Sequence, residues 1–281
     1  MNFGAFRQVF YQRLTKHYKQ GELQTLYHWC VEELEGWGRA QAYLHDEDEM
    51  DEARLSRWEK VIERLQQQEP VQYIFGKTLF FGLELQVDAR VLIPRPETEE
   101  LVEWVLNSEG LSEERVLDIG TGSGCIALAL KSQRPQWQLR ACDVSEGALD
   151  VARGNAAILH LPIDFVQADV LGDDEVFDWG SIWVSNPPYI PAHQQKFMED
   201  RVLAHEPHLA LFEDHPLQFF EAILAKARTS GVRRVYFETH AQEQGELETL
   251  VARTLGANAT ATFKLDLAGK PRFLRVEIQS S

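Results

Sequence analysis

The run Val116-Leu117-Asp118-Ile119-Gly120-Thr121-Gly122-Ser123-Gly124 joins a short apolar segment to a loop with glycine at every second position. The apolar part is typical of a buried strand, and the residues from Cys125 to Lys131 are typical of a helix. Glycines in such a loop let the backbone turn sharply and let a ligand approach closely. The run therefore predicts the first strand, loop and helix of an α/β fold with a ligand at the loop.

Apolar runs alternate with helical segments after Arg115. The strand-like runs lie at residues 116–119, 138–142, 164–167, 182–184 and 235–237. This alternation predicts a doubly wound, Rossmann-like α/β fold with a mostly parallel sheet. Residues 261–267 and 272–278 flank Gly269-Lys270-Pro271 and predict a closing antiparallel hairpin.

The N-terminal part of the chain has a different pattern. In residues 1–69, three stripes of apolar side chains recur at helical spacing, which predicts a small helical bundle. Residues 70–96 hold two β-like runs, Val71–Phe75 and Leu83–Val87, and predict a hairpin that links two domains. The second domain then spans residues 97–281.

The composition is that of an ordinary globular protein, with 44% hydrophobic and 26% charged residues among 281. No apolar run approaches the roughly 20 residues that a membrane span needs, so we expect no membrane partner. The N-terminal residues 1–4 do not resemble a secretory signal, and Cys30, Cys125 and Cys142 show no Cys-x-x-Cys spacing. Both features favour a cytoplasmic location.

The chain is acidic, with 28 basic against 44 acidic side chains and a net charge of −16. Such a field repels phosphate backbones, so we expect no direct binding of nucleic acid. The acidity could also serve solubility alone, and a local basic groove is compatible with it. We expect the protein to act as a monomer.

The spacing of the loop glycines separates two classes of nucleotide ligand. A nicotinamide dinucleotide fingerprint would place its third glycine at position 125, which is Cys125. The glycines instead stand at positions 120, 122 and 124, a register that resembles the first motif of class I methyltransferases. We therefore predict that Gly120 to Gly124 bind S-adenosylmethionine; the alternative for the loop alone is a tight turn without a ligand.

Two acidic residues lie at successive predicted strand ends beyond the loop. Asp143 follows the loop by about 20 residues, the distance at which a carboxylate reaches the two ribose hydroxyls of a nucleoside. Asp169 is predicted to accept from the adenine amino group, with Val170 beside the ring. Together with the loop they form the predicted cofactor site.

The tetrapeptide Asn186-Pro187-Pro188-Tyr189 follows the predicted strand 182–184. An amide or exocyclic amine nitrogen is a poor nucleophile because its lone pair is delocalised. The side-chain oxygen of Asn186 and the carbonyl of Pro187 can each accept one N–H and aim that lone pair at a sulfonium methyl group. The prolines make the segment stiff, and Tyr189 offers a flat face.

These four residues are the predicted substrate site, and Asn186, Pro187 and Tyr189 the predicted catalytic residues. A stiff turn without chemistry is the alternative reading of the tetrapeptide. We predict methyl transfer by in-line displacement without a metal ion. His205, Glu206 and His208 lie close in sequence, but Pro207 breaks the helix that a metal-binding histidine pair would need.

Four further segments carry a resemblance to a known family. They are Pro70–Gly76, Val91–Glu99, His205–Leu211 and Asp266–Arg272, and with Asn-Pro-Pro-Tyr they resemble the release factor glutamine methyltransferases, the PrmC/HemK family. The resemblance implies a protein substrate, a peptide chain release factor, methylated on the side-chain nitrogen of the glutamine in its Gly-Gly-Gln motif.

The resemblance also implies roles for individual residues. It implies cofactor contacts for Gly120 to Gly124, Asp143, position 170 and Asn186, and substrate contacts for residues 186–189. Val170 departs from the aromatic residue that relatives often carry there. Residues 1–69 are expected to recognise the release factor.

Other readings stay open at this point. A DNA or RNA adenine-N6 methyltransferase would present a similar amine, but it needs a basic, aromatic-lined surface that this acidic chain does not suggest. A non-catalytic binding protein would not require the intact Asn-Pro-Pro-Tyr. Arg95 and Glu97 could order the substrate entrance or pair with each other on the surface, and we favour the pairing.

Overall fold

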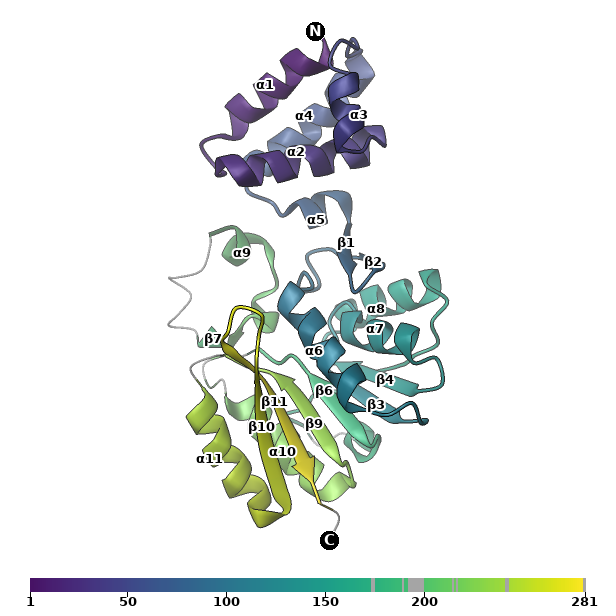
Figure 1. Ribbon diagram of the computed structural model, residues 1–281, viewed down its shortest axis with the longest axis vertical. Coiled ribbons are helices and arrows are strands. Elements are labelled where there is room, and N and C mark those ends of the chain that lie inside the picture. The colour runs from purple at the N-terminus through teal and green to yellow at the C-terminus, as the bar shows by residue number, and fades with distance from the viewer. Residues whose placement is uncertain are drawn as a thin grey trace. The chain divides into compact units, whose positions relative to one another are not determined.

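The computed structural model describes residues 1–172, 175–188, 190–191, 200–213, 215, 217–240 and 243–279 (Figure 1). The chain divides into two compact units. One comprises residues 1–76 with 199–205, and the other residues 77–198 with 206–281.

The first unit is helical and is built around aromatic side chains. Its helices are α1 (Phe3–Leu14), α2 (Gln20–Glu35), α3 (Arg39–Leu44), α4 (Glu52–Gln66), α5 (Val71–Phe75) and α9 (Asp200–His205). Trp58 lies at the centre, fully buried, with the rings of Phe3, Phe6 and Phe10 within about 6 Å of it. The three apolar stripes correspond to α1, α2 and α4, so the predicted helices are confirmed.

The prediction of a strand over Val71–Phe75 is wrong, because these residues form helix α5. Pro70 begins the helix, and its carbonyl accepts from the amides of Tyr73 and Ile74. Gly76 ends it in the left-handed conformation at φ 71°. Val71 packs in the aromatic core of the helical unit, which a five-residue apolar run can do equally well as a helix.

The hairpin that precedes the sheet is therefore shorter than predicted. It pairs β1 (Lys77–Phe80) with β2 (Leu83–Gln86), and only its second strand matches the prediction. Phe81 and Gly82 form the two-residue turn with φ values of 50° and 78°. Positive φ at both positions is the geometry that matches the twist of a two-stranded ribbon.

The second unit holds a seven-stranded sheet in the order β10-β11-β9-β6-β3-β4-β5. The strands are β3 (Arg115–Ile119), β4 (Gln138–Asp143), β5 (Asp164–Gln167), β6 (Ile182–Ser185), β9 (Arg234–Glu238), β10 (Ala259–Leu265) and β11 (Pro271–Ile278). The strands from β9 to β5 are parallel, and β10 and β11 form an antiparallel hairpin against β9 (Figure 1). The predicted Rossmann-like sheet with its closing hairpin is confirmed. A separate pair, β7 (Ile190–Pro191) and β8 (Phe212–Glu213), is also parallel.

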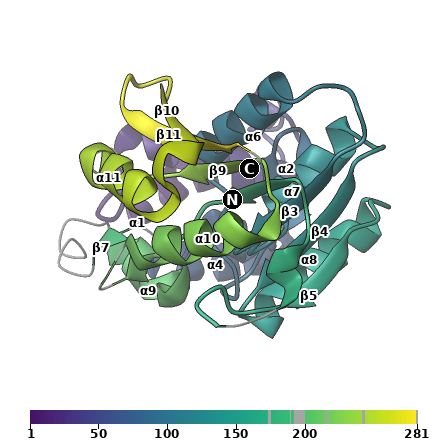
Figure 2. The same ribbon diagram turned by 90° about the horizontal axis from the view of Figure 1, so that it is seen from below.

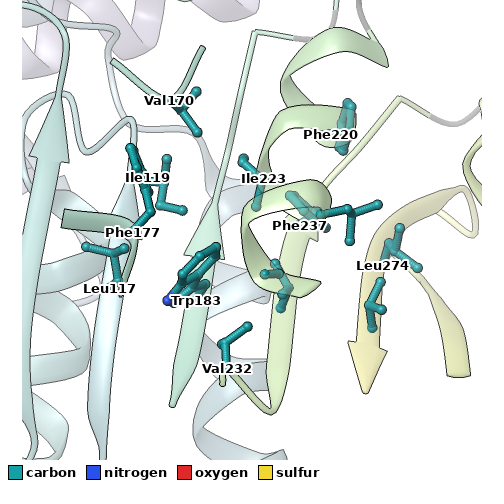
Figure 3. Packing of buried hydrophobic residues seen from close by; sticks show 14 of the residues in the cluster. Leu117, Ile119, Val170, Phe177, Trp183, Phe220, Ile223, Val232, Phe237 and Leu274 are labelled. Atoms are coloured by element: carbon teal, nitrogen blue, oxygen red, sulfur yellow. The ribbon is translucent and has the colours of Figure 1, made fainter. Parts of the chain in front are cut away.

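Helices cover both faces of this sheet, as Figure 2 shows for α6 and α10 on either side of β9. The helices are α6 (Pro96–Ser108), α7 (Cys125–Gln133), α8 (Glu146–Ile158), α10 (Leu217–Ser230) and α11 (Gln244–Leu255). Successive side chains of a strand point to opposite faces. Trp183 accordingly packs with Phe220 and Ile223 of α10 (Figure 3), whereas Ile182 and Val184 pack on the α6 and α7 side.

The strand order reverses at β3. The chain runs from β3 outward through β4 to β5 and then returns to β6 on the other side of β3. In open α/β sheets, ligands bind at such a reversal, outside the carboxyl ends of the strands. Among the described residues, no helix is both long and apolar enough to cross a membrane.

Candidate active site

A cavity of about 190 Å³ opens at the carboxyl ends of β3, β4 and β6. Six of the predicted cofactor residues line it: Gly120, Gly122, Asp143, Asp169, Val170 and Asn186. Pro187 and Pro188 line it as well. The fold thus brings together residues that the sequence spreads over almost 70 positions. Tyr189 lies outside the described residues.

The glycine loop is fixed by backbone hydrogen bonds to the neighbouring strand. The amides of Gly120 and Thr121 both donate to the carbonyl of Cys142 at 2.9 and 3.0 Å. Gly120 and Gly122 have φ values of 73° and 55°, and a Cβ at either position would meet no atom within 4 Å. Glycine is needed there for the backbone conformation, and the open space beside it is available to a ligand.

Gly124 serves a different purpose from the other two. Its φ is 83°, and a Cβ there would lie 3.2 Å from the side chains of Ala152 and Leu128. It therefore allows α7 to begin close against α8. Thr121 and Ser123 are buried and do not line the cavity, and the Thr121 hydroxyl instead donates to the Asp118 carboxylate beneath the loop.

Asp143 holds the loop while facing the cavity. One carboxylate oxygen accepts from the Gly122 amide and the other from the Ser145 amide, each at 2.9 Å. Burial raises the pKa of Asp143, and these backbone donors oppose that rise by favouring the charged form. A carboxylate has about four acceptor positions, so capacity remains for two ribose hydroxyls.

Asp169 and Val170 lie just beyond β5, which ends at Gln167. Asp169 is therefore not the last residue of the strand, as predicted, but the second residue after it; its carboxylate accepts from the Leu171 amide at 2.9 Å. Val170 is buried in the cluster that contains Ile119 and Ile223 (Figure 3). These aliphatic side chains form a wall suited to a flat ring.

Asn186 is the first residue after β6 and is held by a chain of buried polar groups. Its amide nitrogen donates to the Thr98 hydroxyl at 3.2 Å, and that hydroxyl donates to the Glu238 carboxylate at 2.7 Å. Thr98 and Glu238 are 3% and 1% exposed. The strand end is tied as well, because the Ser185 hydroxyl donates to the Ile119 carbonyl.

The sequence prediction missed three residues that build this site. Thr98 and Glu238 are two of them, and Asn155 of α8 is the third. The Asn155 side chain accepts from the Gln86 amide and donates to the carbonyls of Gln86 and Ser123, so it joins β2 to the glycine loop. A polar residue on the otherwise apolar face of a helix was the only available signal for Asn155.

The favoured pairing of Arg95 with Glu97 is wrong. The Arg95 guanidinium pairs with Glu206 at 2.6 Å, and the side chain of Glu206 is 1% exposed. A buried carboxylate needs a cationic partner more than a surface carboxylate does. Glu206 stands directly before Pro207, which lines the cavity, so the pair fixes one wall of the site.

Asp118 is a buried acid beneath the glycine loop. Its Oδ2 accepts from the Thr121 hydroxyl at 2.6 Å and the Ala127 amide at 3.2 Å, whereas its Oδ1 is buried without a partner among the described residues. Burial raises the pKa of Asp118 to about 7, and the nearby charge of Asp143 adds to the effect.

Comparison with protein families gives matches over both units. A family described as "PrmC N-terminal domain" matches residues 7–76, and one described as "Methyltransferase small domain" matches residues 97–211. A release factor glutamine methyltransferase of Flavobacterium psychrophilum is 36% identical over 98% of each chain. One of Lactococcus lactis is 40% identical over 78% of this chain and 81% of its own.

Solved structures of low sequence identity share the fold of the sheet unit. The hMettl16 catalytic domain in complex with MAT2A 3′UTR hairpin 1 superposes with a TM-score of 0.56 at 18% identity, over 72% of this chain and 76% of that one. The delta-N METTL16 MTase domain gives 0.54 at 19% identity, over 70% and 89%. At these identities the likeness concerns the fold alone.

The raised pKa of Asp118 gives the folding stability a pH dependence. The folded chain holds this proton up to about pH 7, whereas an unfolded aspartate loses it near pH 4. The stabilisation that this proton gives to the folded chain is therefore complete below pH 4 and is lost as the pH rises through 7. Between pH 6 and 8 the free energy of unfolding should fall by about 1 kcal/mol from this group.

Replacing Asp118→Asn should remove that fall, because the amide oxygen still accepts from Thr121 but does not titrate. Urea unfolding of both proteins at pH 6 and pH 8, followed by circular dichroism, measures the difference. Equal changes in unfolding free energy between the two pH values for both proteins would contradict the assignment.

Proposed function

The chain belongs to the release factor glutamine methyltransferase family, and on that premise we propose that it transfers a methyl group from S-adenosylmethionine to a release factor. The acceptor is the side-chain amide nitrogen of the glutamine in the Gly-Gly-Gln motif. The observation that carries this proposal is the position of Asn186-Pro187-Pro188 on the wall of the cavity that also contains Asp143 and the loop glycines.

The residues around the cavity suit S-adenosylmethionine. The open space beside Gly120 and Gly122 admits the chain that carries the sulfonium, and Asp143 can accept from the ribose hydroxyls. The aliphatic wall at Val170 takes the adenine ring, with Asp169 near its amino group. When bound, S-adenosylmethionine supplies a methyl group on a positively charged sulfur.

The substrate nitrogen must be held in one orientation before it reacts. The Asn186 side-chain oxygen and the Pro187 carbonyl each accept one N–H of the glutamine amide, which leaves the nitrogen lone pair aimed at the methyl carbon. Proline fixes φ, so residues 187 and 188 present this carbonyl from a stiff backbone. Tyr189 is proposed to cover one face of the planar amide.

Methyl transfer then proceeds by a single displacement. The amide nitrogen forms the new C–N bond as the C–S bond breaks, and the bonding pair stays on sulfur. Positive charge develops on the nitrogen, and the two acceptor oxygens stabilise it. One N–H proton then leaves to water, which suffices because a positively charged amide nitrogen is a strong acid.

The helical unit is proposed to recognise the body of the release factor. The cavity is lined by residues of the sheet unit and, at about 190 Å³, is far too small to receive a folded protein. Specific selection of one protein therefore requires contacts elsewhere on the chain.

Incubation with labelled S-adenosylmethionine tests the activity. We expect label to enter a purified release factor and not a variant in which the glutamine of Gly-Gly-Gln is replaced by alanine. Double-stranded DNA and an RNA hairpin serve as the competing acceptors. Label in either nucleic acid and none in the release factor would reverse the assignment.

Asn186→Ala should separate catalysis from cofactor binding. Loss of one preorganised polar group commonly lowers turnover on the order of 10²- to 10³-fold, whereas affinity for S-adenosylhomocysteine should stay within about threefold. Asn107→Ala, on the exposed side of α6, is the matched control. Calorimetry and single-turnover kinetics measure the two quantities, and wild-type turnover in Asn186→Ala would rule out the proposed role.

Removal of the helical unit tests substrate recognition. A chain of residues 77–281 that retains its circular dichroism spectrum should bind S-adenosylhomocysteine normally and methylate a short Gly-Gly-Gln peptide at the rate of the full chain. Its activity on the whole release factor should fall by about 10-fold or more. Unchanged activity on the whole protein would show that recognition lies in the sheet unit.

A further inference from the structure

Three buried or half-buried polar side chains from distant parts of the sequence form one line that ends at the cavity. Glu238 is the last residue of β9, Thr98 lies in the first turn of α6, and Asn186 follows β6. The Glu238 to Thr98 contact measures 2.7 Å and the Thr98 to Asn186 contact 3.2 Å. Asn186 lines the cavity, whereas Thr98 and Glu238 lie behind it.

The hydrogen-bonding capacity of these groups gives the line a direction. The Thr98 hydroxyl donates to the Glu238 carboxylate, so its single proton is committed to that contact. The hydroxyl then has only lone pairs to offer to Asn186. Of the two ends of the Asn186 amide, only the NH₂ group can satisfy a lone pair, so the nitrogen faces Thr98.

We propose that Glu238 and Thr98 are positioning residues that set the orientation of the Asn186 amide, so that its oxygen and not its nitrogen is presented to the substrate. This inference rests on the proposed function, in which that oxygen accepts an N–H of the target glutamine. In the reverse orientation, the NH₂ group of Asn186 would face the NH₂ group of the target glutamine. The two hydrogen bonds thereby select the one productive orientation of the Asn186 amide, whose oxygen and NH₂ group have nearly the same size.

The same arrangement explains why the first turn of α6 is packed against β9. Thr98 must reach Glu238 on one side and Asn186 on the other, and the contact of α6 with β9 places it between them. Pro96 at the first helical position begins the helix two residues earlier and fixes where Thr98 lies. A hydroxyl group is the smallest side-chain group that can donate and accept at once.

Two substitutions at position 98 test the proposal. Thr98→Val keeps the shape but removes both links, and Thr98→Ser keeps the hydroxyl. We expect kcat for the release factor to fall about 10-fold in Thr98→Val and to stay within about twofold in Thr98→Ser. The KM values for both substrates should stay within about threefold, because the orientation of Asn186 matters most in the transition state.

Thr239→Val is the matched control. Thr239 is also a buried threonine, and its hydroxyl donates to the Arg272 carbonyl at 3.2 Å without contacting Asn186. It should lose as much thermal stability as Thr98→Val but keep the wild-type kcat. An equal fall of kcat in both valine variants would mean that Thr98 acts only through general stability and would overturn the proposal.

The double variant Thr98→Val with Asn186→Ala identifies the route of the effect. If Thr98 acts through Asn186, adding Thr98→Val to Asn186→Ala should leave the single-turnover rate unchanged. A further 10-fold fall would overturn the proposal, as would a wild-type kcat in Thr98→Val alone. Wild-type turnover in Asn186→Ala, by contrast, would contradict the proposed function itself.

Discussion

The position of β3 between β4 and β6 is the constraint on which the candidate site depends. Parallel strands bring their carboxyl ends to one edge of a sheet, and the reversal of strand order there keeps the connecting segments from covering that edge. The glycine loop follows β3, Asn186 follows β6, and Asp143 is the last residue of β4. The two bonds from the loop to the Cys142 carbonyl then lock the loop against β4.

Buried polar side chains provide a second level of organisation in this unit. Asp118, Asn155 and Glu238 are each almost completely buried, which is unfavourable unless hydrogen bonds compensate. Each of them binds a segment that lines the cavity. Asp118 binds the glycine loop through Thr121, and Asn155 binds the same loop through Ser123. Glu238 binds Asn186 through Thr98. The segments that line the cavity are thus held by buried polar groups that do not line it.

Most of the sheet and the residues that line the cavity could be predicted, because the sequence signals for them are local. Short apolar runs that alternate with helical segments predict the strands, and Asp143 and Asn186 lie at or directly after strand ends. Thr98, Asn155 and Glu238 could not be predicted, since their partners lie 88, 69 and 140 residues away. A short apolar run such as residues 71–75 suits either a strand or a helix, and only Pro70 before it and Gly76 after it favour the helix that forms.

In the proposed reaction the two halves of the cavity make different contributions. In that proposal Asp143 and Val170 would contact parts of the cofactor that do not change during methyl transfer, so they would lower the free energies of the bound and transition states equally. The acceptor oxygens of Asn186 and Pro187 are proposed to face the nitrogen on which positive charge develops, so their interaction would strengthen as the C–N bond forms. On this proposal, cofactor binding depends on the β4 and β5 side of the cavity and the reaction rate on the β6 side. Only the β6 side then needs the orientation of a single amide group, that of Asn186, to be fixed from within the protein.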